Sequence, residues 1–290
     1  MFVSTCKNTV KTLFRSPSFW MVVLVGTVYA VYNEVIVSHY GYVDMATYEM
    51  IWDTDPRYIL DFQSYIKLFA NMSNVICMIP SALLCTVSTA VILMRDYGDR
   101  FFEIEKAAGM KPSAYVYGRF VSLTVINTAF HFILLNLCLF SYVITRSGVD
   151  GMTALNTFTD GFVRNIFLEL IMAVPSILIY LCVTYIIGAV FHNGIVAAVG
   201  GIAYALFNMV LNKFFGWSGG EIIAVIRDYL SPVPKKVFWF MYYFRTEWEE
   251  MPLETFNTSA KYVVTSVTAF VIFTAVITLI IYFKTKKRTV

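Results

Sequence analysis

Five long runs without a single charged side chain dominate this 290-residue sequence. They cover residues 16–33, 68–94, 120–145, 170–212 and 262–283. An α-helix rises about 1.5 Å per residue, so about 20 residues cross a hydrocarbon core of about 30 Å. Four runs fit one crossing each, and the run 170–212 fits two, divided at Phe191-His192-Asn193-Gly194. The sequence therefore predicts an all-α integral membrane protein with six transmembrane helices.

The expected spans cover residues 19–37, 68–94, 115–145, 167–191, 194–212 and 263–283, within a single transmembrane domain of residues 1–290. We expect helices rather than barrel strands, because the runs are continuously apolar whereas barrel strands alternate. Charged residues make up 14% of the chain, about half of the roughly 25% usual in soluble domains. The net charge of +3 is too small to indicate a nucleic-acid partner.

Basic residues are unequally divided between the two sides that six spans define. One side holds both termini and the segment between spans 2 and 3, with 12 basic and 4 acidic residues. The other side holds 10 basic and 15 acidic residues. Because cytoplasmic segments carry the excess of Lys and Arg, both termini are expected in the cytoplasm of a multi-pass plasma-membrane protein.

Signatures of catalysis and metal binding are weak in this chain. No GxxxxGK[ST] loop is present, so the chain does not bind ATP through a P-loop of its own. Gly216-Trp217-Ser218-Gly219-Gly220 matches the pattern GxSxG, but no histidine follows Ser218 to activate it. We expect no catalytic residue, no metal and no cofactor, and an intramembrane hydrolase is the less favoured alternative. Reduced thiols are expected at all five cysteines, Cys6, Cys77, Cys85, Cys138 and Cys182.

Residues 2–16 precede the first span and read as an amphipathic helix that lies on the cytoplasmic membrane surface. A cationic stripe runs beside an apolar one, as such helices require. The apolar positions are Val3, Cys6, Val10, Leu13 and Phe14, and the basic ones are Lys7, Lys11 and Arg15.

Residues 95–112, between spans 2 and 3, read as a short cytoplasmic helix rich in charges of both signs. Gly109 and Pro112 form a normal helix end. Phe101 and Phe102 lie among these charges, away from lipid, which is typical of a protein interface. The alternative is a solvated connector.

Residues 213–262 form the largest segment on the outer side and are dense in aromatic side chains. Aromatic residues gather where a membrane meets water. We expect short helices that dip toward the membrane, and a lid over a ligand is the alternative.

Mild polar side chains follow one face of the second span and recur in the fifth. Such stripes usually pack helices together, and the alternative is the lining of a transport path. The spans contain no string of acids or arginines, which counts against a proton-driven pump or a voltage sensor. Glu34 and Glu169 both lie near the outer ends of their spans, where we expect water to be close. The candidate lining residues are Asn71, Asn74, Met78, Ser81, Ser88 and Asn208.

The stretch Arg95–Phe120 resembles the coupling region of permease subunits of ABC-2-type exporters. Its matching parts are Arg95-Asp96, then Glu105-Lys106-Ala107-Ala108-Gly109-Met110, then Tyr115 and Arg119. The family usually has Glu-Arg or Arg-Glu where Arg95-Asp96 stands, so the chain departs from the pattern there. The amphipathic elbow, the six spans and the outer segment extend the resemblance over nearly the whole chain.

This resemblance implies a division of labour between subunits. A separate ATPase subunit, which binds ATP and Mg²⁺, would dock on the coupling helix 95–112. Two permeases, a homodimer or a pair of related chains, would form the translocation path, mainly from spans 2 and 5. The ATPase-coupling residues implied are Arg95, Asp96, Phe101, Phe102, Glu103, Glu105 and Gly109.

The mild lining and the absence of a large outer domain favour an amphipathic cargo. Bacterial exporters of amphipathic peptides, including phenol-soluble-modulin exporters and lantibiotic-immunity systems, use permeases of this build. The resemblance thus implies a bacterial peptide exporter, with drug, lipid-linked and ion cargoes as alternatives. The rival from another class is a self-contained secondary transporter, although the sequence has no convincing internal repeat.

Overall fold

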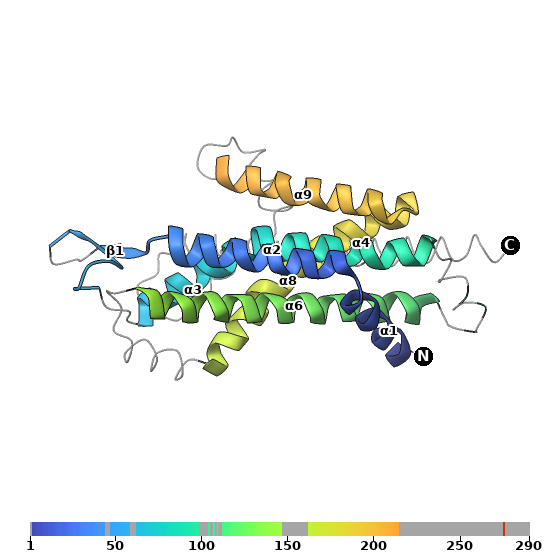
Figure 1. Cartoon of the computed structure of the whole chain (residues 1–290), viewed down its shortest axis with the longest axis horizontal. Coiled ribbons are helices and arrows are strands. Elements are labelled where there is room, and N and C mark those ends of the chain that lie inside the picture. Colours follow the sequence, from blue (N-terminus) through green and yellow to red (C-terminus); the bar gives the residue numbers. More distant parts are fainter. Residues whose placement is uncertain are drawn as a thin grey trace.

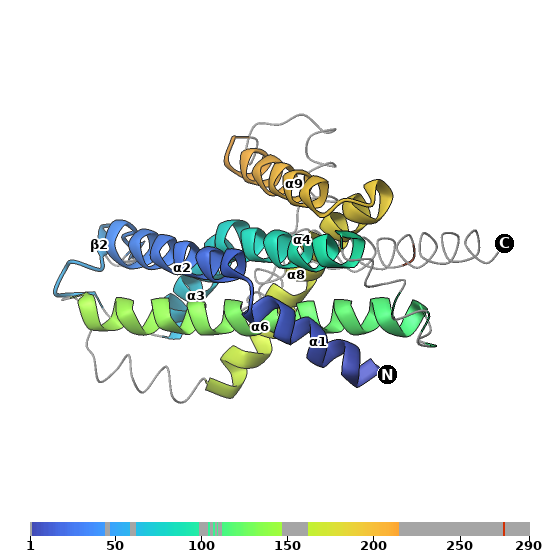
Figure 2. The ribbon, with the colours of Figure 1, turned by 45° about the vertical axis from the view of Figure 1, so that its right-hand side comes forward.

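The fold is a bundle of long helices, seen in a computed structural model that describes residues 2–43, 47–58, 62–98, 112–146 and 162–214, and positions 104, 107, 109 and 275. Three helices run side by side along the long axis (Figure 1). They are α2 (Pro17–Val31), α4 (Ala82–Gly98) and α6 (Pro112–Thr145). Two more helices, α8 (Phe162–Phe191) and α9 (Gly194–Phe214), pack mainly against α4 and each other. The short helix α1 (Phe2–Phe14) lies at one end and crosses α6 (Figure 2).

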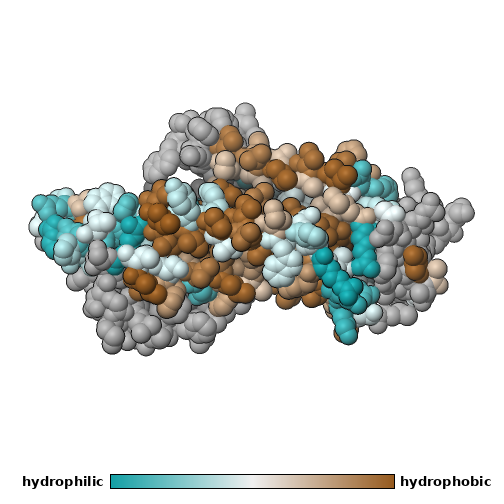
Figure 3. Space-filling model, in the orientation of Figure 1, coloured by the Kyte–Doolittle hydropathy of each residue, from teal (hydrophilic) through white to brown (hydrophobic). Residues whose placement is uncertain are grey.

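Three helices are long and apolar enough to cross a membrane. They are Pro17–Val37, Asn71–Gly98 and Ala114–Thr145, and the shorter apolar helices Ser176–Phe191 and Gly194–Val210 accompany them. Hydrophobic side chains cover the middle of the molecule, and hydrophilic ones gather on α1 and at the opposite end (Figure 3). The chain is therefore a helical membrane protein, as the charge-free runs predict. The predicted sixth span, 263–283, lies almost entirely outside the described residues.

The second predicted span is the middle of a longer helical stretch. It consists of α3 (Phe62–Ile76), the π-helical turn η2 (Cys77–Ser81) and α4. Pro80 lies inside η2, and because a proline has no N–H and crowds the preceding turn, a wider turn keeps the stretch continuous. The span was predicted to end at residue 94, but α4 continues to Gly98. Arg95 and Asp96 therefore belong to the last turn of α4 and not to a separate segment.

The break predicted at 191–194 is confirmed. His192 adopts a left-handed backbone conformation with φ of +52°. The side-chain Oδ1 of Asn193 then accepts hydrogen bonds from the backbone N–H groups of Ile195, at 2.8 Å, and Val196, at 3.4 Å. Asn193 thus caps the first turn of α9, which lets a second helix begin immediately.

A β-hairpin, which the sequence analysis did not predict, lies at the end opposite α1 (Figure 1). Its strands are β1 (Gly41–Val43) and β2 (Met50–Trp52), paired antiparallel with Tyr42 opposite Ile51. Three-residue strands carry too little periodicity to be recognised among polar residues. Ile51 is buried beneath the hairpin and anchors it to the bundle.

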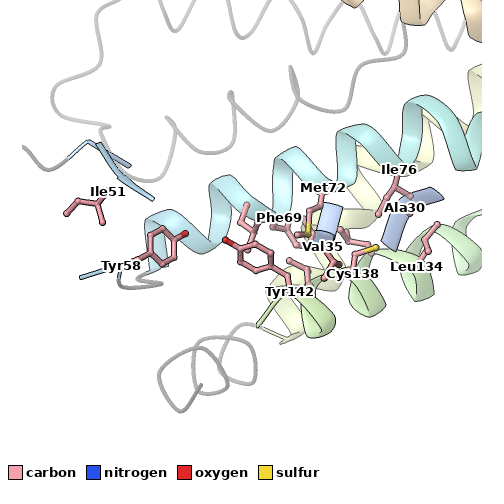
Figure 4. Close-up of a cluster of buried hydrophobic side chains, with 13 residues drawn as sticks. Ala30, Val35, Ile51, Tyr58, Phe69, Met72, Ile76, Leu134, Cys138 and Tyr142 are labelled. Atoms are coloured by element: carbon pink, nitrogen blue, oxygen red, sulfur yellow. The ribbon is translucent and has the colours of Figure 1, made fainter. Parts of the chain in front are cut away.

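The bundle core at the hairpin end joins α3, α6 and the end of the first span (Figure 4). The first span ends in a second π-helical turn, η1 (Tyr32–Val37). Aliphatic and aromatic side chains from these elements interlock around Cys138 and Tyr142 of α6. A second cluster, around Leu84 and Tyr180, joins α4, α6, α8 and α9 at mid-length. The polar side chains described below lie beside these two apolar clusters.

Candidate functional site

A buried ion pair joins α4 to α6 at the end of the bundle where α1 lies. The Nη2 atom of Arg119 is 2.9 Å from Oδ1 of Asp96, and the two side chains are 0% and 4% exposed. The Tyr115 hydroxyl donates to the same Asp96 oxygen and accepts from Arg119 Nη2 at 2.7 Å. The guanidinium also lies over the Tyr115 ring, 4.8 Å from its centroid. We call Thr9, Asp96, Tyr115 and Arg119 the α1-end network.

Helix α1 completes this network with a polar face. Arg119 Nη1 donates to the Thr9 hydroxyl at 3.0 Å, and that hydroxyl donates onward to the carbonyl of Thr5 at 2.8 Å. Arg95, the residue before Asp96 in α4, donates to the Thr12 hydroxyl. The two guanidinium groups that flank the charge-rich segment 95–112 are therefore both held by threonines of α1.

The face of α1 that packs on the bundle differs from the predicted apolar face. Thr5, Thr9 and Leu13 are the buried positions, whereas Val3, Val10 and Phe14 are exposed. Leu13 thus leaves the predicted stripe and joins the central core. The reason is that the buried guanidinium of Arg119 needs hydrogen-bond acceptors, which a wholly apolar face of α1 could not provide.

The predicted ATPase-coupling residues that the structure describes differ in how far they are buried. Arg95 is half-buried against α1, and Asp96 is buried in the ion pair, so neither side chain is freely displayed. Gly109 is exposed in a turn with φ of +83°, a conformation that favours glycine at helix ends. Phe101, Phe102, Glu103 and Glu105 lie outside the described residues. The role of Arg119 as the buried partner of Asp96 escaped the sequence analysis, although a lone arginine beginning an apolar run was the available signal.

The candidate lining residues are divided between the surface of the helix and its packed side. Asn71, Asn74 and Met78 are half-buried, and the Asn74 amide donates to the Met78 sulfur at 3.6 Å. Ser81 and Ser88 are buried against α6.

The buried part of this stripe makes contacts between helices. Asn127 of α6 donates to the Ser88 hydroxyl at 3.2 Å, and Asn208 of α9 is buried. The packing interpretation therefore fits Ser81, Ser88 and Asn208. Among the six candidate lining residues, only Asn71, Asn74 and Met78 retain exposed surface.

His131 is the centre of a second polar cluster, deep in the bundle. Its Nδ1 atom lies 3.0 Å from the Ser81 hydroxyl and 3.5 Å from the Cys77 sulfur, and its Nε2 atom lies 3.2 Å from the Ser73 hydroxyl. Cys77 and Ser81 belong to the π-helical turn around Pro80, and Ser73 lies one turn earlier, in α3. The sequence analysis treated the three histidines as scattered, because residues 54 positions apart in sequence meet only through packing. In the described part of the chain, no three His, Cys, Asp or Glu side chains gather as a metal site would require.

A third network holds the hairpin end, where Asp53 is completely buried. Asp53 Oδ2 accepts from the Tyr142 hydroxyl at 2.7 Å and lies 3.4 Å from Arg146 Nε, while Oδ1 lies 3.0 Å from His39 Nδ1. Arg146 also donates to the carbonyl of Ser38 at 2.6 Å. These bonds fasten the loop after the first span to the end of α6.

Glu34 corrects an expectation, because the sequence analysis placed it near water. It is 1% exposed, and its carboxylate accepts hydrogen bonds from the Tyr40 hydroxyl, at 2.5 Å, and from the Asn33 amide. Burial and the nearby Glu34 carboxylate raise the pKa of Tyr40 above its usual range, so the hydroxyl stays protonated and keeps donating. The loop folds back over the end of the span and removes this carboxylate from water.

The described elements together define a helical membrane protein. Its polar networks lie at the two ends of the bundle and in the buried cluster around His131. A scan against models of known protein families found no match for this chain, and a search of curated proteins found none either. The functional assignment therefore depends on the sequence and on the geometry of these networks.

Proposed function

We propose that this chain is the membrane-spanning permease subunit of an ATP-driven exporter of the ABC-2 type. In this proposal it has six spans with both termini in the cytoplasm, and it forms the translocation path as a dimer. ATP hydrolysis takes place in a separate ATPase subunit that docks on the coupling helix between spans 2 and 3. The cargo is an amphipathic peptide.

The α1-end network is the observation that carries this proposal. The coupling segment leaves the last turn of α4 and re-enters the bundle through α6, whose residue Arg119 is ion-paired with Asp96. A buried ion pair resists separation, because parting its members leaves each charge without compensation. A displacement of the segment would therefore move α4 and α6 together instead of being absorbed at their ends. Such a rigid base is what a segment that transmits force from an ATPase requires.

The mild character of the half-buried stripe supports the proposed cargo. Asn71, Asn74 and Met78 present amide and thioether groups and no charge. Methionine adapts to irregular apolar partners, and amides offer both donors and acceptors. A lining of this kind suits a peptide with one apolar and one polar face better than a strongly ionic cargo.

The decisive experiment alters the coupling segment without touching a span. The variant Glu103→Lys/Glu105→Lys reverses two charges, and Phe101→Ala/Phe102→Ala removes two aromatic anchors. Both should insert normally in the membrane but should capture the ATPase at least about tenfold less well in a gentle-detergent pull-down, or should uncouple hydrolysis from transport.

Two outcomes of this experiment have a clear meaning. The matched control Glu249→Lys/Glu250→Lys, in the outer segment, should capture the ATPase as the wild type does. If the coupling variants also bind the ATPase and transport normally, the segment is a solvated connector and the proposal is wrong.

One observation favours a second candidate, a self-contained secondary transporter. The continuous stretch α3–η2–α4 contains a π-helical turn at Pro80, and π-helical turns inside α-helices often lie at functional sites. Purification in gentle detergent separates the two classes, because an exporter permease should co-purify with a P-loop ATPase. Transport by the isolated chain in vesicles, driven by an ion gradient and without ATP, would favour the second candidate.

A further inference from the structure

The outward side of α1 carries a stripe of positive charge. Lys7 and Lys11 of α1, and Arg15 directly after its end, recur every four residues and are all exposed. At helical spacing these positions lie on one face. No acidic residue precedes Glu34 in the sequence, so no nearby carboxylate along the chain offsets these charges. The hydrophilic surface that they form stands out at this end of the molecule (Figure 3).

An apolar stripe borders the cationic one. Val3, Val10 and Phe14 are exposed on α1, and the exposed Trp20 follows in the next helix. The Trp20 indole N–H donates to the carbonyl of Phe14 at 2.9 Å, which fixes the turn between α1 and the first span. Tryptophan is typical of the boundary between headgroups and hydrocarbon. Because the span Pro17–Val37 begins directly after α1, the two stripes lie at that boundary.

We propose that α1 binds the headgroups of anionic phospholipids. This binding holds a third face of α1, which carries Thr9 and Thr12, against Arg119 and Arg95. The basic stripe contacts the phosphates while the apolar stripe enters the acyl region. The third face carries Thr9 and Thr12, which accept hydrogen bonds from the two guanidinium groups. Anionic lipid thereby stabilises the α1-end network from outside the bundle. The inference requires only that the chain spans a membrane, so it stands or falls separately from the proposed transport role.

The experiment uses the full-length chain in lipid nanodiscs made of phosphatidylcholine alone or with about one third phosphatidylglycerol. Each basic residue near an anionic surface strengthens binding about fivefold, so three strengthen it roughly 100-fold. We therefore expect the backbone amides of α1 to exchange hydrogen at least about tenfold more slowly in the anionic discs. About 0.5 M salt should remove most of this difference, because the Debye length then falls to a few ångströms.

Three variants test the parts of the proposal separately. Lys7→Gln/Lys11→Gln/Arg15→Gln should lose the lipid-dependent protection, whereas the charge-preserving control Lys7→Arg/Lys11→Arg should retain it. In the wild type, anionic lipid should also raise the thermal midpoint by a few degrees. Thr9→Val should keep the protection of α1 but lose this rise, because it cuts the link to Arg119.

The opposite results would overturn the proposal. Equal exchange in the two kinds of disc would show that the stripe does not recognise lipid charge. Full protection in neutral discs on adding inorganic phosphate would assign the stripe to a free anion and not to a lipid surface. Protection that survives in the triple glutamine variant would show that the cations are not responsible.

Discussion

At the scale of single residues, the buried Arg119–Asp96 pair predicts strongly non-additive mutations. Arg119→Met leaves the Asp96 carboxylate buried without its cation, so we expect a loss of about 3–5 kcal/mol in stability. Asp96→Leu should cost a similar amount for the converse reason. The double variant removes both charges and should recover most of the loss. Thermal or denaturant unfolding of the four proteins in the same nanodisc measures this cycle.

The same cycle also shows how the prediction would fail. Costs that simply add in the double variant would mean that the two charges do not compensate each other. A conservative Arg119→Lys change is expected to be intermediate, because a lysine cannot reach Asp96, Tyr115 and Thr9 in the fixed planar arrangement of a guanidinium.

At the scale of elements, the close packing of α4, α8 and α9 depends on a small residue. A Cβ atom added at Gly201 would lie 2.5 Å from Thr184 Oγ1 and 2.6 Å from Thr86 Cγ2, which is too close for any real contact. Gly201→Ala should therefore push the helices apart and cost about 1–3 kcal/mol, despite the better helix propensity of alanine.

Gly98 supplies the matched control for this prediction. An added Cβ there meets nothing within 4 Å, although Gly98, the last residue of α4, also belongs to a packed helix. Gly98→Ala should leave the thermal midpoint unchanged or slightly raised, while Gly201→Ala lowers it. Equal midpoints for the two variants would show that the helices yield without cost at Gly201.

At the scale of the whole molecule, a six-span permease supplies half of a pathway. The proposed function therefore predicts a working complex of two permeases and two ATPase subunits. Native mass spectrometry of the complex extracted in gentle detergent measures this stoichiometry directly. A fully active complex that holds a single permease would contradict the proposal, whether the partner permease is a second copy or a related chain.

The sequence alone determined the helical class and the positions of five helices within a few residues. The reason is that a membrane span leaves a one-dimensional signature: an apolar run of the right length, ended by charges, a proline or a capping residue such as Asn193. The break at 191–194 and the start of α9 followed from the same local rules. Residues 263–283 and the outer segment stay predictions, because they lie almost entirely outside the described part of the chain.

Only the tertiary structure decided which polar groups meet. Arg119 and Asp96 are 23 positions apart, Thr9 is 110 positions from Arg119, and His131 meets Cys77 across 54 positions. No local periodicity encodes such distances, because the partner of a buried charge is chosen by how helices pack. For the same reason the sequence analysis assigned Leu13 to the lipid face and Glu34 to water. Hydrophobic length places helices in a membrane, whereas the need to pair buried polar groups sets how they turn and pack against each other.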